Sequence, residues 1–433
     1  GDVYKRQVIG SGAREHALCR ILDKSYLCEK VFCFPGNYGI GQIAECKNIS
    51  TKEDIIRECI KINPDLIVVG PENYLSENIA GELRNNGLNV FGPDSKGAKL
   101  ESSKEFMKEF CQAHDIATAK SQTFVDFEKA KNYLMSFSGP IVVKYDGLAA
   151  GKGVFVCTDT NEAIEACKRV FINKEFNQEN NKVVIEDFIE GRELSFFTIT
   201  DGEDYLNFGS AQDYKRIGDN DTGPNTGGMG TISPAPILED NLNTIIQEEI
   251  VKKTINGLKQ DNIAFQGVIF FGIIVNEYNQ PYLLEYNTRF GDPEIQSISL
   301  RVKSDFLSLL HSTATKNLKY AKIEFYENKK SICLILATKG YPENYPENTE
   351  IRNISKFENN DDFYIFHAAT KLIDNKIFSN GGRVLSIVAS GNDYLECRKK
   401  VYEIADMIDW PEKYYRSDTV SYTHLTLPTN REV

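Results

Sequence analysis

A lysine ends an apolar stretch of this sequence and is followed by a run of very small residues. Residues 141–153 read I-V-V-K-Y-D-G-L-A-A-G-K-G, so Lys144 closes the apolar stretch and Lys152 lies between glycines. A lysine at the end of a buried strand needs a counter-charge, because an isolated buried ammonium is costly. Asp146 or another nearby acid is one candidate, and a polyphosphate beneath the glycine-rich loop is the other. The stretch lacks the G-x-x-x-x-G-K-[ST] pattern of a P-loop, so it predicts a phosphate site of another kind.

A second stretch combines candidate metal ligands with an arginine. Residues 284–294 read L-E-Y-N-T-R-F-G-D-P-E and close an apolar run. Alternate residues of a strand share one face, which places Glu285 and Asn287 together. Carboxylate and amide oxygens suit Mg²⁺, which completes its octahedron with water and phosphate oxygens. Arg289 has the fork geometry that binds a carboxylate or phosphate, and an ion pair with Asp292 is the alternative.

A third stretch has the pattern of two strands joined by a short hinge. Residues 183–196 read V-V-I-E-D-F-I-E-G-R-E-L-S-F. Such a hinge can pair the edge of an adenine through Glu186 and backbone groups, and Glu193 can accept hydrogen bonds from ribose hydroxyls. Taken alone, each acid is more often part of a surface ion pair, so this alternative stays open.

The first glycine-rich turn begins like a dinucleotide fingerprint but departs from it. Residues 10–15 read G-S-G-A-R-E, with Glu15 in place of the last glycine of G-x-G-x-x-G. The next apolar run ends F-P-G-N at residues 34–37, without a carboxylate for a ribose hydroxyl, and both departures argue against a nicotinamide cofactor. Backbone N–H groups at a helix start still suit a phosphate monoester. The alternative is that the glycines only permit a tight turn.

Short apolar runs alternate with helical stretches over the first hundred residues. This alternation predicts βαβ units and a parallel sheet, in which ligands gather at the carboxyl ends of the strands. The composition of residues 203–232, rich in Gly, Asp, Asn and Thr, predicts a long functional loop. Later apolar patterns predict strands at 141–143, 183–186, 194–200, 267–275, 281–287, 331–337 and 383–389, and helices near 102–106, 161–171 and 401–408.

The composition is that of an ordinary globular protein of two or three domains. The chain has 433 residues, of which 41% are hydrophobic and 26% charged, and a formal net charge of −12. This acidic balance argues against nucleic-acid binding, and no apolar run is long enough to span a membrane. None of the ten cysteines forms a C-x-x-C pair, and no secretory signal opens the chain. We therefore expect reduced thiols and a cytoplasmic protein.

Both ends of the sequence differ from what the interior predicts. A first strand inside a parallel sheet is expected to be apolar, yet Y-K-R-Q precedes Val8. The final V-S-Y-T-H-L-T-L-P-T-N-R-E-V has no helical period. Both ends resemble translated sequencing-adaptor sequence, and we expect that neither residues 1–7 nor residues 419–433 are wholly native. A disordered tail and an edge strand are the alternative.

Three long motifs together resemble the phosphoribosylamine–glycine ligase family of the ATP-grasp superfamily. They are V-V-K-Y-D-G-L-A-A-G-K-G, D-Y-K-R-I-G-D-N-D-T-G-P-N-T-G-G-M-G and E-Y-N-T-R-F-G-D-P-E, with V-I-G-S-G-A-R-E-H-A, P-G-N, V-G-P-E and N-G-G-R-V-L in support. The resemblance covers roughly residues 8–418. It implies a ligase that joins glycine to 5-phosphoribosylamine through glycyl phosphate, with ATP and Mg²⁺ or Mn²⁺, as a monomer that binds neither nucleic acid nor membrane.

The resemblance also implies a fold and its division into domains. It is an α/β and α+β multidomain fold with a parallel-sheet domain over 1–100, a central ATP-grasp domain over 101–325, and a small C-terminal α+β domain over 326–418. A mobile lid is expected at about 121–191, and 419–433 is the suspected non-native tail.

Residue roles carried over from the family fall into four groups. Lys104, Lys144 and the Gly151–Lys152–Gly153 loop would hold ATP phosphates, with Glu186 and Ile189 around adenine and Glu193 at the ribose. Glu285 and Asn287 would bind the metal. The acyl-phosphate and amine site would comprise Arg289, Asp292, Asp213 and the loop Thr222, Gly223, Pro224, Asn225, Thr226, Gly227 and Gly228, and the catalytic residues would be Lys144, Arg289, Asp292 and Asp213. The phosphoribosyl group would lie against Gly10, Gly12, Arg14, Asn37 and Glu72.

Three rival interpretations remain, and one departure from the superfamily bears on them. Another ATP-grasp ligase, such as a carboxylase, is disfavoured by the long D-T-G-P-N-T-G-G-M-G loop. A nucleotide-binding module without catalysis is disfavoured by the lysines and metal ligands, and the chain could also be part of a larger multifunctional purine-synthesis protein. Many ATP-grasp enzymes have a second metal-binding acid on the preceding strand, where residues 271–275 here read F-G-I-I-V.

Overall fold

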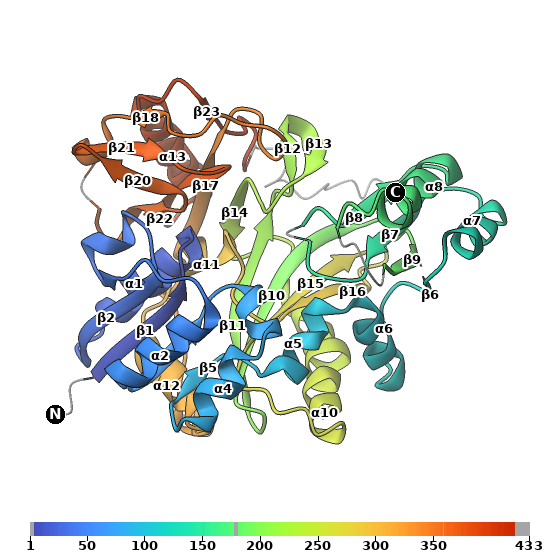
Figure 1. Cartoon of the computed structure of the whole chain (residues 1–433), viewed down its shortest axis with the longest axis horizontal. Helices are drawn as coiled ribbons and strands as arrows, with labels where there is room; N and C mark the ends of the chain where they lie inside the picture. The colour runs from blue at the N-terminus through green and yellow to red at the C-terminus, as the bar shows by residue number, and fades with distance from the viewer. Residues whose placement is uncertain (1–3, 150, 177–180, 358, 421–433) are drawn as a thin grey trace.

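The N-terminal part of the chain forms the predicted parallel sheet. The computed structural model describes residues 4–149, 151–176, 181–357 and 359–420. The strand order is β3-β2-β1-β4-β5, every pairing is parallel, and helices flank the sheet (Figure 1). The elements are β1 (Tyr4–Gly10), α1 (Ala13–Asp23), β2 (Cys28–Pro35), β3 (Glu45–Cys46), α2 (Lys52–Ile62), β4 (Leu66–Val69), α3 (Glu72–Ser76), α4 (Ile79–Asn85) and β5 (Val90–Phe91).

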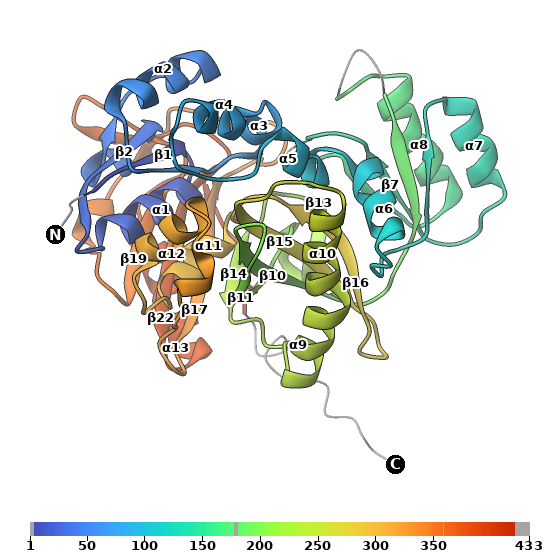
Figure 2. The ribbon, with the colours of Figure 1, turned by 90° about the horizontal axis from the view of Figure 1, so that it is seen from below.

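A small antiparallel sheet forms a separate lobe over the region predicted to be a lid. Its order is β6-β9-β7-β8, and α7 and α8 pack together beside it, apart from the rest of the molecule in Figure 2. Helices α5 and α6 connect this lobe to the N-terminal sheet. The elements are α5 (Ser95–Ser102), α6 (Lys104–Ala113), β6 (Ser121–Phe124), α7 (Phe127–Met135), β7 (Ile141–Tyr145), β8 (Val154–Cys157), α8 (Thr160–Phe171) and β9 (Val183–Asp187).

A long antiparallel sheet occupies the middle of the molecule. Its order is β16-β15-β10-β11-β14-β17-β22-β19, with β23 paired to β17. Helices α9 and α10 pack with β15 and β16 around a second apolar core. The elements are β10 (Arg192–Thr200), β11 (Tyr205–Asp213), β14 (Gly230–Ser233), α9 (Asp240–Ile246), α10 (Lys252–Gln260), β15 (Gly267–Val275), β16 (Pro281–Asn287), α11 (Glu294–Ser299), α12 (Phe306–Ala314), β17 (Lys330–Thr338), β19 (Phe363–His367), β22 (Arg383–Gly391), α13 (Tyr394–Met407) and β23 (Lys413–Tyr414).

The prediction of one long loop over 203–232 is wrong. Most of this segment is strand: β11 and β14 belong to the long sheet, and β12 (Arg216–Gly218) pairs with β13 (Thr222–Asn225) in a hairpin. The polar composition misled because β11 is only partly buried and its last residues, Gln212 and Asp213, line a cavity. Tertiary pairing overrode the weak β propensity of Gly, Asn and Asp.

The C-terminal region shares its sheet with the centre of the chain. Strand β14 pairs with β17 through Gly230–Leu334 and Ser233–Ser331, so the sheet passes without a break into the C-terminal region. A smaller sheet of β18 (Glu350–Ile351), β21 (Lys376–Ser379) and β20 (Thr370–Ile373) lies at its edge. The α+β character was predicted from the family resemblance, but the continuity of the sheet was not. In the described part of the chain, no helix has the length and apolar character needed to cross a membrane.

Polar side chains in the first strand are buried at the centre of the N-terminal sheet. Arg6 and Gln7 have no exposed surface, and Nη1 of Arg6 donates to the Lys5 carbonyl at 3.0 Å and lies 3.5 Å from Oδ2 of Asp65. Two guanidinium nitrogens of Arg6, Nε and Nη2, have no hydrogen-bond partner among the described residues. Burial lowers the pKa of this guanidinium, against the opposing effect of Asp65. The first strand therefore contains a charge that its surroundings satisfy poorly.

Replacing Arg6 with leucine is expected to stabilise the protein. A leucine fits a buried strand position and removes the desolvated charge, which is expected to raise the free energy of unfolding by about 1–3 kcal/mol. Urea denaturation of the two proteins measures the change. Lys5→Leu on the exposed side of the same strand is the matched control and is expected to change stability by less than about 0.5 kcal/mol. A less stable Arg6→Leu protein would contradict this account.

Candidate active site

A large cavity lies where three parts of the structure meet: the lobe formed by the β6-β9-β7-β8 sheet (hereafter the lid lobe), the N-terminal sheet and the long sheet. Its volume is about 920 Å³, and its lining is rich in charged side chains. Residues predicted for the site that line it are Arg14, Glu72, Lys104, Lys144, Gly151, Gly153, Glu186, Ile189, Glu193, Asp213, Asn225, Thr226, Gly227, Glu285, Asn287, Arg289 and Asp292. The structure thus brings together segments that lie far apart in the sequence.

Lys144 shares a buried carboxylate with a second lysine. Strand β7 ends beside β9, and the Lys144 ammonium pairs with Oε1 of Glu186 and donates to the Leu284 carbonyl at 3.1 Å. Lys108 pairs with the other oxygen, Oε2, at 2.5 Å. Burial opposes ionisation of Glu186, but Lys144 and Lys108 together hold the pKa of its carboxyl below its usual range. Three buried charges therefore stabilise one another, and Asp146 is not the counter-ion of Lys144.

Asp146 instead fixes the position of Lys104. Its Oδ1 accepts the backbone N–H groups of Lys104 at 2.5 Å and Glu105 at 3.2 Å, at the start of α6. The Lys104 ammonium donates to the Gly147 carbonyl at 2.9 Å, and burial lowers its pKa. The K-Y-D-G turn after β7 therefore holds the second predicted phosphate-binding lysine beside the first.

Glu285 and Asn287 lie at the end of β16 and line the cavity. Burial opposes ionisation of Glu285, but the positive charges of Lys215, Lys144 and Lys104 lower the pKa of its carboxyl. The Asn287 oxygen accepts a hydrogen bond from Arg289 at 3.0 Å. The described residues contain no cluster of three or more His, Cys, Asp or Glu that could hold a metal. One carboxylate and one amide oxygen fit Mg²⁺ that takes its other ligands from phosphates and water.

Arg289 is held by two carboxylates from the N-terminal side of the cavity. It lies 3.0 Å from Oε1 of Glu101 and 3.3 Å from Oε2 of Glu72. Burial opposes ionisation of Glu72, but Arg289 and then Arg14 lower its pKa to about 2. The alternative ion pair between Arg289 and Asp292 is not the arrangement found. Asp292 accepts from Gln296 at 2.7 Å and lies near Arg383.

Asp213 is packed beneath the loop of residues 222–228. Burial and the neighbouring Glu294 raise the pKa of its carboxyl well above the usual range. Gly228 has a φ of 110°, and a Cβ there would lie 2.7 Å from Oδ1 of Asp213. The loop therefore needs glycine at this position, because its backbone approaches a buried carboxylate.

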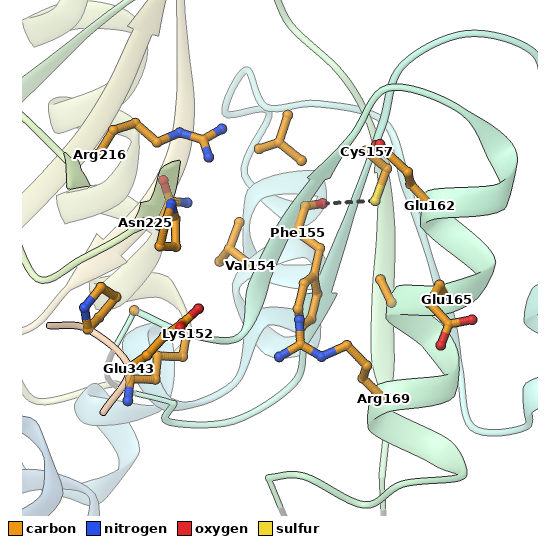
Figure 3. Close-up of a pocket in the computed structure, with 15 residues that line it drawn as sticks. Lys152, Val154, Phe155, Cys157, Glu162, Glu165, Arg169, Arg216, Asn225 and Glu343 are labelled. Carbon is orange, nitrogen blue, oxygen red and sulfur yellow. Dashed lines mark hydrogen bonds between the residues drawn. The ribbon is translucent and has the colours of Figure 1, made fainter. Parts of the chain in front are cut away.

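A second cavity of about 570 Å³ adjoins the first on the outer side of the glycine-rich loop. Figure 3 shows Lys152, Arg169 and Glu343 around it, between β8 and α8 on one side and the β12–β13 hairpin on the other. Pro224 also lines it. Lys152 therefore faces the gap between the lid lobe and the body. Three residues of the predicted loop lie outside both linings: Thr222 and Gly223 are exposed, and Gly228 is buried.

The predicted phosphoribosyl residues divide into two groups. Arg14 and Glu72 line the main cavity, whereas Gly10, Gly12 and Asn37 do not. The Gly12 N–H donates to Glu15 at 2.6 Å, and a Cβ at Gly10 would lie 2.6 Å from the Glu15 side chain. These glycines accommodate Glu15, as expected for the tight-turn alternative. Phosphate binding by this turn stays a prediction.

Asn37 joins the N-terminal and C-terminal regions. Its amide nitrogen donates to Ser11 O and His367 O, each at 2.7 Å, and its oxygen accepts from Ile40 N at 3.0 Å. Both ends of the amide are thus already bonded within the protein. This arrangement gives Asn37 a structural role between two regions of the chain.

Several charged residues of the cavity were missed from the sequence. Lys108 could have been found, because it follows Lys104 by four residues and so shares its helix face. Lys215, Glu294 and Arg383 stand in the quoted motifs that begin D-Y-K-R, end G-D-P-E and read N-G-G-R-V-L, but no role was assigned to them, and Glu101 stands in none of the quoted motifs.

Paired lysines beneath a small antiparallel lobe, facing carboxylate and amide oxygens across one cavity, define the ATP-grasp class of enzymes. Residues 102–295 match the family model described as "Phosphoribosylglycinamide synthetase, ATP-grasp (A) domain". Models of the N and C domains of the same synthetase match residues 5–101 and 331–420. The chain belongs to the phosphoribosylglycinamide synthetase family.

Relatives and solved structures agree with this family. The chain is 41% identical to phosphoribosylamine–glycine ligase of Brucella melitensis, over 95% of this chain and 96% of that protein. It is 39% identical to the bifunctional purine biosynthetic protein of Pichia angusta, over 98% of this chain and 54% of that one. The crystal structure of phosphoribosylamine–glycine ligase from Thermotoga maritima matches with a TM-score of 0.84 at 32% identity, covering 96% and 99% of the two chains. A biotin carboxylase domain from Hydrogenobacter thermophilus, 16% identical with a TM-score of 0.72, covering 96% and 92%, shares the fold.

Proposed function

We propose that this chain joins glycine to 5-phosphoribosylamine at the expense of ATP, forming glycinamide ribonucleotide, ADP and phosphate. The observation that carries the proposal is one cavity lined by Lys104, Lys144, Glu285 and Asn287 in a chain of this family. In this reaction the glycine carboxylate attacks the γ-phosphoryl group, and the amine then displaces phosphate from glycyl phosphate. Neither step needs a nucleophile from the enzyme.

Binding of ATP is assigned to the lid side of the cavity. Lys104 and Lys144 line this side and would neutralise phosphate charge, which together with positioning is the main requirement of phosphoryl transfer. Glu285 and Asn287 would hold Mg²⁺ or Mn²⁺, which would supply further neutralisation of the phosphates. The Gly151–Gly153 loop would cover the phosphates and exclude water from glycyl phosphate.

Recognition of the nucleoside is assigned to the strand β9 and the hinge after it. Ile189 and backbone groups of the hinge would frame adenine, and Glu193 would accept from the ribose. Glu193 pairs with Lys215 at 2.7 Å. When ATP binds, this ion pair would either separate or remain while Glu193 also accepts hydrogen bonds from the ribose hydroxyls. Because the Glu186 carboxylate already pairs with Lys144 and Lys108, its role would be to orient these lysines. Backbone groups of the hinge would then contact adenine.

The acyl-phosphate side is assigned to Arg289, Asp292, Asp213 and the loop from Thr222 to Gly228. Arg14 in α1 and Glu72 in α3 reach the same cavity from the N-terminal part of the chain and would contact the phosphoribosyl group, together with the Gly10–Gly12 turn and Asn37. This region contains both arginines and carboxylates, namely Arg14, Arg289, Glu72, Asp213 and Asp292. Such preorganised charges stabilise a developing anion without reorganisation during the reaction.

The test is ADP formation from magnesium-ATP with glycine and phosphoribosylamine omitted in turn. The amine can be made in place from ribose 5-phosphate and ammonia. We expect ADP only when both substrates and the divalent cation are present, with glycinamide ribonucleotide formed in equal amount. If ADP forms only with a different acid or amine, the protein is still an ATP-grasp ligase, but glycine and phosphoribosylamine are not its substrates. No ADP from a folded Arg6→Leu protein would favour a nucleotide-binding module.

We also propose that the chain is a cytoplasmic monomer. Size-exclusion chromatography with light scattering tests the oligomeric state directly, and a mass of 48.9 kDa is expected for one chain.

A further inference from the structure

An arginine of the C-terminal region reaches into the cavity of the ligase. Arg383 begins β22, far in sequence from the lid and the glycine-rich loop, yet it lines the main cavity. Its Nη1 donates to the carbonyl oxygens of Gly227 at 2.6 Å and Asp292 at 2.9 Å, with Gly228 O at 3.3 Å. The Arg383 side chain therefore joins two segments that line the site: the loop of residues 222–228 and the turn after β16.

The glycine-rich turn is shaped around this guanidinium. A Cβ at Gly227 would lie 2.9 Å from Cζ of Arg383, so only glycine allows this approach. The Gly227 N–H donates to the Tyr341 hydroxyl at 3.1 Å, and Tyr341 also comes from the C-terminal region. Both backbone groups of Gly227 are thus held by C-terminal side chains.

Arg383 also lies among the buried carboxylates of the site. Its Nη2 is 3.6 Å from Oδ1 of Asp292. Burial opposes ionisation of Asp292, but Arg383 and Arg14 lower the pKa of that carboxyl. The Arg383 guanidinium therefore offsets the negative charge of Asp292 and also binds the backbone carbonyl groups of Asp292 and Gly227.

We propose that Arg383 is a positioning residue of the ligase, which holds the Gly227–Gly228 turn and Asp292 in place on the acyl-phosphate side of the cavity. The proposal rests on the function proposed above and makes the C-terminal region part of the active site. Arg383 contacts none of the ATP-side residues Lys104, Lys144 and Glu186 in any hydrogen bond or ion pair of the described structure. Its loss should therefore affect the second half of the reaction and spare nucleotide binding.

The test compares Arg383→Met, Arg383→Lys and a matched control, Arg20→Met. Arg20 is a buried arginine that also bridges to the C-terminal region, through Asn360 O at 3.3 Å and Asp361 at 3.4 Å, and it does not line the cavity. For each protein we would measure the affinity for ATP, kcat, the KM for phosphoribosylamine, and the ratio of ADP to glycinamide ribonucleotide. Wild-type turnover with both substrates is measured first, so failure of the ligase assignment is seen separately.

We expect Arg383→Met to lose about 10²-fold in kcat, because small displacements of positioned groups have effects of this size. Its affinity for ATP should stay within about threefold of wild type, and its ADP-to-product ratio should rise above one, since a loosened turn admits water to glycyl phosphate. Arg383→Lys should recover part of the rate, and Arg20→Met should keep wild-type coupling.

Two results would overturn the proposal. One is wild-type kcat and coupling in Arg383→Met. The other is a loss of ATP affinity and turnover shared equally by Arg383→Met and Arg20→Met, which would indicate a merely structural role. If Arg383→Met does not fold, Gly227→Ala replaces it, because a Cβ 2.9 Å from Cζ of Arg383 forces the guanidinium and the turn apart, whichever of the two shifts, and should raise the same ADP-to-product ratio. A coupling ratio of one in Gly227→Ala would then reject the proposal.

Discussion

Replacing Lys144 with methionine is expected to lower ligase turnover by about 10²–10³-fold, the usual effect of removing one preorganised electrostatic contact to a transition state. Lys144 is almost fully buried, at 6% exposure, and lies on the cavity beside Lys104. Methionine keeps most of the side-chain volume and removes the charge. The loss is expected in kcat with glycine and phosphoribosylamine saturating, measured as ADP formation.

Two further proteins separate the role of Lys144 in catalysis from its role in charge balance. Lys144→Met leaves Glu186 paired with Lys108, whereas the double variant with Glu186→Gln also removes the buried counter-ion of Lys108, so the double variant is expected to be less stable than Lys144→Met while turnover stays low. Lys152→Met changes an exposed lysine of the loop after β7, which lines the second cavity but not the main one, and is expected to have a much smaller effect. Wild-type turnover in Lys144→Met, or recovery of turnover in the double variant, would reject the phosphate-binding role.

Replacing Arg289 with methionine is expected to lower the free energy of unfolding by about 3–5 kcal/mol at pH 7, the usual cost of removing one partner of a buried ion pair. The Glu101 side chain is only 8% exposed and would lose the arginine at 3.0 Å. Glu72 would lose its nearer arginine as well. Urea denaturation at pH 7 measures the change, and the double variant with Glu101→Gln is expected to recover a large part of it. A single variant as stable as wild type would contradict the charge balance described here.

The same ion pair predicts how stability changes in acid. The pKa of Glu72 is about 2 in the folded protein, against a usual value of 4.5. A lowered folded-state pKa contributes stability above pH 4.5, and this contribution is lost as the pH falls from 4.5 towards 2. In Arg289→Met the pKa of Glu72 should rise, because Arg289 is its main favourable partner. The acid-dependent loss should therefore be smaller than in wild type, and an unchanged pH dependence would count against the assignment.

Local patterns in the sequence were sufficient where the governing interactions are short-range. The strands around Lys144 and Glu285 were predicted because short continuous runs of apolar residues identify buried strands without knowledge of their partners. The period of two within a strand placed Glu285 and Asn287 together, and both line the cavity. The parallel sheet of the N-terminal part followed from the alternation of strand and helix, since a parallel pair requires a crossover connection.

The sequence by itself therefore determined the class of fold, the family and the lysines, carboxylate and amide that face the cavity. Only the tertiary structure decided which charges pair. Glu186 reaches Lys144 through the register of β7 against β9, Glu101 meets Arg289 across 188 positions of the chain, and Arg383 meets Gly227 across 156. Strand register and packing between domains bring these residues together, and a buried charge is satisfied by whichever opposite charge the fold places nearest. A pairing of that kind leaves no periodic trace in the sequence.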